Sequence, residues 1–201
     1  MLETTALACE RGPRRLFADL SFAVAPGGLL RVSGANGSGK TTLLRTLAGL
    51  TRPAAGAVRW RGESIGEDFR KEMLFLGHAP AVKDELTVLE NLEFAVQLSG
   101  LKNGECKKAL EQLGIARLAD LPARYLSQGQ RRRAALARLA LSAAVPLWLL
   151  DEPFAALDSA GMAQVSALCA AHLAAGGMLV LTSHQDVAIG SAAAQSIELN
   201  G

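Results

Sequence analysis

The stretch SGANGSGKTT, residues 33–42, joins two segments with different patterns. Leu29, Leu30 and Val32 before it predict a strand, and the leucine spacing over 43–50 predicts a helix. Three glycines within six residues would weaken a helix interior by about 1 kcal/mol each. Glycine also lets successive backbone N–H groups turn toward one point, beside the positive end of the following helix. The stretch therefore predicts an anion site between a strand and a helix.

The spacing within this stretch matches the phosphate-loop pattern of Gly, four residues, Gly, Lys and Thr. Lys40 is placed to reach the β- and γ-phosphates of a nucleotide, and the Thr41 hydroxyl is placed to hold Mg²⁺. A glycine-rich turn without a ligand is the alternative, but the pattern specifies four residue types in the context that it requires. The predicted nucleotide-binding residues are Gly34, Ala35, Asn36, Gly37, Ser38, Gly39, Lys40, Thr41 and Thr42.

Length and composition are compatible with one α/β domain of 201 residues. The net charge of +2 is too small to indicate a nucleic-acid or membrane-surface footprint. Cys9, Cys106 and Cys169 lie far apart from one another, so a reduced, cytosolic setting is expected. The first 15 residues lack the apolar core of a signal peptide, and we expect no export.

The most apolar segment, residues 134–150, is too short and too interrupted for a membrane span. It predicts a helix over 131–142 and then a buried parallel strand, LWLLD, which ends at Asp151 and Glu152. Ligands of open parallel sheets bind at the carboxyl ends of strands. We expect Asp151 to hold Mg²⁺ through its water shell and Glu152 to orient and polarise an attacking water. The alternative is an ordinary polar strand end or helix start.

The segment LSQGQRRR, residues 126–133, opens this helix without an acidic residue. The positive helix end is therefore free for a second negative ligand. Its three arginines cannot share one helix face, and we interpret them as a solvated surface rather than a nucleic-acid patch.

These motifs together resemble the ATP-binding-cassette (ABC) ATPases, whose signature is Leu-Ser-Gly-Gly-Gln. This chain has Gln128 at the third signature position, followed by LWLLDEP, by ALD at 156–158 and by TSH at 182–184. The resemblance implies a head-to-tail dimer that encloses two ATP molecules. Ser127 and Gly129 would then act on ATP held by the other subunit, Asp158 would lie at the dimer seam, and His184 would contact the γ-phosphate. It also makes Glu152, His184 and Lys40 the catalytic residues.

The resemblance covers essentially the whole chain and implies a single α/β domain with the P-loop NTPase fold. Residues 1–77 and 143–201 would form a RecA-like parallel-sheet core with an antiparallel β portion near the N-terminus. Residues from about 79 to 142 would form a helical insertion. Within it, LTVLENLEFAVQL and CKKALEQLG show helical apolar spacing, and Thr87 with Glu90 predicts a capping box.

Two positions depart from the family pattern. Arg11 stands where most members stack an aromatic ring on adenine, and its guanidinium could stack there instead or be a solvated turn residue. Phe17 is a less suitable substitute, because it is placed to anchor a strand. His78 stands where the family has the Gln that links the γ-phosphate and Mg²⁺ to the helical insertion. With these departures the chain resembles the ATPases of the bacterial cytochrome c biogenesis system.

That subfamily implies an ATPase that hydrolyses MgATP at the cytoplasmic face of the bacterial inner membrane. Its expected partners are a second copy of itself, a CcmB-like integral membrane subunit and further cytochrome c maturation membrane proteins. The complex would export or otherwise handle haem, although we expect neither nucleic acid nor haem to bind this chain directly. The alternatives are the ATPase of another small-molecule transporter and a soluble cassette acting as a switch in translation or DNA repair. Cargo and direction of transport stay open at this point.

Overall fold

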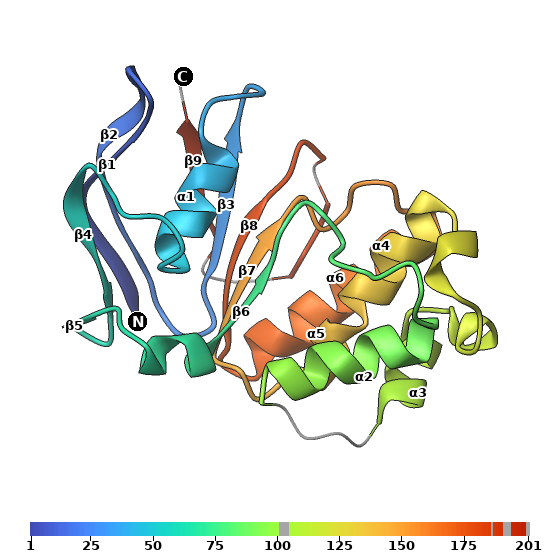
Figure 1. Cartoon of the computed structure of the whole chain (residues 1–201). Helices are drawn as coiled ribbons and strands as arrows, with labels where there is room; N and C mark the ends of the chain where they lie inside the picture. Colours follow the sequence, from blue (N-terminus) through green and yellow to red (C-terminus); the bar gives the residue numbers. More distant parts are fainter. Residues whose placement is uncertain (101–104, 186, 191–193, 200–201) are drawn as a thin grey trace.

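Figure 1 shows a computed structural model of the chain, in which two β-sheets and a group of helices lie side by side. The structure describes residues 1–100, 105–185, 187–190 and 194–199, and the predicted core and insertion each include some residues outside this part. The strands are β1 Leu2–Arg11, β2 Arg14–Val24, β3 Leu29–Gly34, β4 Ala55–Trp60, β5 Glu63–Ser64, β6 Met73–Leu76, β7 Leu147–Asp151, β8 Met178–Thr182 and β9 Ala194–Leu199. The α-helices are α1 Lys40–Leu47, α2 Val88–Leu98, α3 Cys106–Gln112, α4 Gln128–Leu136, α5 Arg138–Leu141 and α6 Ser159–Ala174, and the short 3-10 helices are η1 Asp68–Glu72, η2 Ala116–Leu118 and η3 Ala123–Tyr125.

The N-terminal sheet is antiparallel, with strand order β2-β1-β4-β5. Helix α1 lies between this sheet and the second one (Figure 1). Leu43, Leu44 and Leu47 of α1 are fully buried in one apolar cluster that includes Leu2 and Leu7 of β1. The predicted antiparallel β portion near the N-terminus is confirmed.

The second sheet is parallel, with strand order β6-β7-β8-β3-β9. All five residues of β7 are buried. Leu147 and Leu149 join the cluster around α1, whereas Trp148 and Leu150 join the cluster that includes α6, because successive side chains of a strand point to opposite faces. A strand covered on both faces needs a continuous apolar run. The predicted buried strand LWLLD is therefore confirmed.

The strand order places the carboxyl ends of three strands at one edge of this sheet. Strands β7, β8 and β3 are neighbours that run in the same direction. They end at Asp151, Thr182 and Gly34, and Asp151 is paired directly with Thr182. The phosphate loop and the acidic strand end are brought together here.

Helices α2, α3, α4 and α5 follow β6 and precede β7 in the chain, and they lie together at one end of the molecule (Figure 1). Thr87 caps α2: its hydroxyl accepts a hydrogen bond from the Glu90 N–H, and the Glu90 carboxylate accepts one from the Thr87 N–H. The predicted capping box is confirmed.

Two predicted helix boundaries are wrong. The helix expected over 131–142 begins at Gln128, because Ser127 caps it, and it is interrupted at Ala137 between α4 and α5. The helix expected to extend to Leu50 ends at Leu47, because Gly49 adopts a left-handed conformation with φ of +69°. Among the described residues, no helix is long and apolar enough to cross a membrane.

Candidate nucleotide-binding site

The phosphate loop connects β3 to α1 and requires glycine for two different reasons. A Cβ atom on Gly34 would lie 2.5 Å from the Leu199 carbonyl oxygen and 2.7 Å from Ser38 Oγ. Gly39 has a φ of +104°, which residues with side chains rarely adopt, and a Cβ atom there would lie 3.0 Å from Leu16 Cβ. The loop conformation thus depends on residues without side chains, as the sequence pattern predicts.

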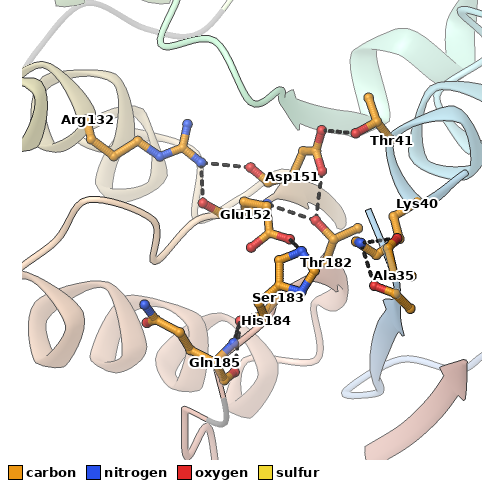
Figure 2. A network of polar contacts seen from close by, with 11 residues as sticks. Ala35, Lys40, Thr41, Arg132, Asp151, Glu152, Thr182, Ser183, His184 and Gln185 are labelled. Carbon is orange, nitrogen blue, oxygen red and sulfur yellow. Dashed lines mark hydrogen bonds and ion pairs between the residues drawn. The ribbon is translucent and has the colours of Figure 1, made fainter. Parts of the chain in front are cut away.

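Two polar side chains of the loop are placed for an anion. Lys40 Nζ donates hydrogen bonds to the carbonyl oxygens of Gly34 at 2.7 Å and Ala35 at 3.1 Å, so the ammonium group lies across the loop (Figure 2). Ser38 Oγ is buried without a hydrogen-bond partner among the described residues. The first turn of α1 contains no acidic residue. A positive helix end, an ammonium group and an unsatisfied hydroxyl therefore suit a phosphate group.

Asp151 connects the loop to the parallel sheet. Its carboxylate is buried and accepts hydrogen bonds from the Thr41 hydroxyl at 2.8 Å and from the Thr182 hydroxyl at 2.7 Å (Figure 2). Thr182 also accepts a 2.8 Å hydrogen bond from the Glu152 N–H. This role of Thr182 was not predicted from the sequence, although a Thr that ends an apolar strand beside an acidic strand end is a signal for it.

Glu152 has an unusual backbone conformation for a residue with a side chain. Its φ of +51° lies in the left-handed region. Its side chain is mostly buried, and Oε1 lies 3.5 Å from Nε2 of His184. Figure 2 shows this carboxylate beside His184, below the Asp151 carboxylate. The two acidic residues therefore have different surroundings: Asp151 is held by hydroxyl groups and Glu152 by its backbone.

A cavity of about 510 Å³ brings most of the predicted site residues together. Among its lining residues are Arg11, Asn36, Gly37, Gly39, Lys40, Thr41, Thr42, His78, Asp151, Glu152 and His184. Arg11 and His78 are both exposed. Within the described residues, no group of three or more His, Cys, Asp or Glu side chains could by itself hold a metal ion.

Ser127, Gly129 and Asp158 line a different cavity, of about 400 Å³. The Ser127 hydroxyl accepts a hydrogen bond from the Gln130 N–H at 3.3 Å, and the Gln130 side chain accepts one from the Ser127 N–H at 2.8 Å. Asp158 caps α6 through the Gly161 N–H and is paired with Arg133. The Gly161 hydrogen bond, more than Arg133, lowers the pKa of Asp158. A single chain therefore keeps the signature residues apart from the phosphate loop.

The interpretation of the three arginines as a solvated surface is wrong for Arg132. Arg131 pairs with Asp84 and Arg133 with Asp158, whereas Arg132 is only 5% exposed. Successive helix residues are rotated by about 100°, so one of the three faces the interior. There its guanidinium contacts the carbonyl groups of Asp151 and Glu152.

A model of the ABC transporter family matches residues 17–155. The chain therefore belongs to the ABC transporter family. It corresponds to the ATP-binding subunit of such a transporter.

Within that family, the chain is similar to proteins named cytochrome c biogenesis ATP-binding export protein CcmA. The protein of that name from Aromatoleum aromaticum is 52% identical over 191 residues, which cover 92% of this chain and 89% of the relative. The protein of that name from Dechloromonas aromatica is 50% identical over 204 residues, which cover 99% of this chain and 100% of the relative.

The fold is also similar to a solved structure, a dimeric ATP-binding cassette in a post-hydrolysis state bound to ADP and Pi. The TM-score is 0.76 at 25% identity, and the match covers 92% of this chain and 88% of the other.

Proposed function

We propose that this chain is the MgATP-hydrolysing subunit of a membrane complex that exports or handles haem during cytochrome c biogenesis. One observation carries the hydrolytic part: the phosphate loop, both acidic residues of the β7 end and His184 line the same cavity. The names of the relatives support the setting in cytochrome c biogenesis.

The residues at the β7 end fit Mg²⁺. The Asp151 carboxylate and the Thr41 hydroxyl supply oxygen atoms, and Mg²⁺ in nucleotide sites takes one or two protein ligands together with phosphate and water. When bound, the ion neutralises charge on the phosphates. His78 lines the same cavity and, in this proposal, accepts a hydrogen bond from a water in the metal's shell.

In the proposed reaction, the Glu152 carboxylate orients a water molecule toward the γ-phosphorus of ATP. The water oxygen forms a bond to phosphorus as the bond to the β,γ-bridging oxygen breaks. ADP leaves with that electron pair, and a water proton passes toward the carboxylate. Lys40 binds the β- and γ-phosphates, and His184 contacts the γ-phosphate. Arg11, which also lines the cavity, stacks on the adenine.

The separate position of the signature residues supports a composite site. Ser127, Gly129 and Asp158 line a second cavity of the same chain, so in this proposal they reach ATP bound by another copy. The similar solved cassette with ADP and Pi is dimeric, which supports a head-to-tail dimer here.

The remaining partners are inferred from the family. In this proposal, the helical insertion at about 79–142 contacts a CcmB-like integral membrane subunit and, through it, further cytochrome c maturation proteins. The chain would then be peripheral to the bacterial inner membrane, on its cytoplasmic face.

The test measures phosphate release from MgATP by the purified chain, alone and with the membrane subunit in lipid vesicles. We expect a basal rate and a higher rate with the membrane subunit. Absence of hydrolysis in both samples would contradict the enzymatic part. Stimulation only by the membrane subunit of a different small-molecule transporter would contradict the role in cytochrome c biogenesis.

A further inference from the structure

We propose that Arg132 is a positioning residue for ATP hydrolysis: it holds the backbone of Glu152 in the conformation that directs the carboxylate into the phosphate cavity. This inference rests on the proposed role of Glu152 in orienting the attacking water.

The guanidinium group of Arg132 binds the ends of two neighbouring strands. Its Nη2 donates hydrogen bonds of 2.7 Å to the carbonyl oxygens of Asp151, the last residue of β7, and of Glu152, which follows it (Figure 2). Its Nη1 donates hydrogen bonds to the carbonyl oxygens of Gly77 at 3.1 Å and His78 at 3.2 Å, after β6. All four partners are backbone atoms. Each terminal nitrogen of the guanidinium therefore donates to the backbone at the end of one strand.

The backbone of Glu152 is fixed at both of its polar groups. Its N–H donates to the Thr182 hydroxyl, and its carbonyl oxygen accepts from the Arg132 guanidinium at 2.7 Å and from the Ala155 N–H at 3.1 Å. The left-handed conformation of Glu152 is disfavoured for a residue with a side chain and persists only where the surroundings impose it. The hydrogen bond from Arg132 is thus one of three that restrain the Glu152 backbone, and it is the shorter of the two at the carbonyl oxygen.

Arginine suits this position better than other donors. Its planar group carries N–H donors that diverge toward two targets, whereas lysine concentrates its donors on one nitrogen and glutamine has only two. Burial lowers the pKa of Arg132, and the nearby Asp151 and Glu152 carboxylates only partly oppose this effect. Because burying a charge is costly, this placement indicates a positional role for the guanidinium.

Arg132 also connects two predicted parts of the composite site. It lies in α4, whose N-cap is Ser127, so the same helix carries the group that acts on the other subunit's ATP. A movement of α4 on ATP contact would therefore act on Glu152 through Arg132.

The test compares Arg132→Gln and Arg132→Lys with Arg131→Gln, a matched control on the same helix whose partner is Asp84. For Arg132→Gln we expect kcat to fall about 100-fold while the dissociation constant of a fluorescent ADP analogue changes little, because a misplacement of about 1 Å in a catalytic group costs that much. Arg132→Lys should be intermediate and provides the test if Arg132→Gln does not fold. Arg131→Gln should keep the wild-type kcat.

A second measurement determines whether Arg132 acts through Glu152. Single-turnover rates are compared for Glu152→Gln with and without Arg132→Gln, and we expect no further loss in the double variant. A further loss as large as that in the wild-type background would overturn the proposal, as would an equal loss of kcat and ADP affinity in Arg132→Gln. An inactive wild type would contradict the proposed function and this inference with it, whereas an active wild type with an equally active Arg132→Gln contradicts only the inference.

Discussion

The Thr41 hydroxyl donates a 2.8 Å hydrogen bond to Oδ2 of Asp151, across a separation of 110 residues in the chain. The bond joins the first turn of α1 to the carboxyl end of β7. The other oxygen of the same carboxylate accepts from Thr182, at the end of β8. Asp151 is therefore held by hydroxyl groups from two other elements, and Glu152 follows it with its own backbone N–H bound to Thr182.

The first prediction concerns Glu152→Gln. The amide keeps the shape of the side chain but cannot accept a proton or polarise water as a carboxylate does. We expect ATP binding to persist and the hydrolysis rate to fall at least about 100-fold. Phosphate release and size-exclusion chromatography with ATP measure the two effects, and a longer-lived dimer should accompany the slow variant. A normal hydrolysis rate would remove Glu152 from the reaction.

Thr182→Val tests the hydroxyl that connects the two acidic residues. Valine has a similar shape, but it leaves one oxygen of the buried Asp151 carboxylate and the Glu152 N–H without a partner. We expect the free energy of unfolding to decrease by about 2 kcal/mol, together with a lower kcat. Thr182→Ser keeps the hydroxyl and serves as the control. Urea unfolding that gives equal values for Thr182→Val and Thr182→Ser would show that this hydroxyl contributes little.

Mixed dimers test whether Ser127 acts on the other subunit's ATP. Combining Ser127→Arg chains with Lys40→Ala chains places both lesions in one composite site and leaves the other site intact. We expect each variant alone to be inactive. Each mixed dimer keeps one intact site, so we expect it to recover up to about half of the activity of a wild-type dimer. Full activity of a demonstrated monomer would contradict the composite site.

His78→Ala tests the link between the nucleotide and the membrane subunit. His78 lines the cavity with its side chain exposed, and its carbonyl oxygen is bound by Arg132. We expect the alanine variant to lose more of the partner-stimulated rate than of the basal rate, and His78→Gln to retain much of the stimulation because an amide oxygen also accepts a hydrogen bond. Equal losses of basal and stimulated rates in the alanine variant would favour a structural role at the strand end.

Local patterns predicted much of this fold and site. The run LWLLD is apolar throughout because β7 is covered on both faces, and the phosphate loop shows its glycine spacing within one short segment. The role of Arg132 could not be predicted in this way. It depends on where the β6 and β7 ends lie, at residues 77–78 and 151–152. The helical periodicity around 131–133 contains no information about these distant positions.

A buried histidine away from the nucleotide cavity leads to a prediction on pH dependence. The His172 ring stacks on Trp148, with centroids 3.9 Å apart and planes 4° apart. Its Nε2 lies 3.2 Å from the Met178 carbonyl oxygen and therefore carries the hydrogen, while Nδ1 is buried without a partner among the described residues. A proton on Nδ1 would be a buried charge with no acceptor. Burial accordingly lowers the pKa of His172, and the Met178 hydrogen bond only partly opposes it.

A folded-state pKa below the unfolded value of about 6.5 means that the unfolded chain binds the proton first as pH falls. The stabilisation is complete above about pH 6.5 and is lost as pH falls toward the folded-state pKa, at up to about 1.4 kcal/mol per pH unit. His172→Phe keeps a ring against Trp148 and removes the titration. We expect it to be about 1 kcal/mol less stable than the wild type at pH 7.5, because the Met178 hydrogen bond is lost, and to lose less stability on going to pH 5.5. Urea unfolding of both proteins at the two pH values measures the difference, and parallel pH dependences would show that His172 does not contribute to the acid sensitivity of the fold.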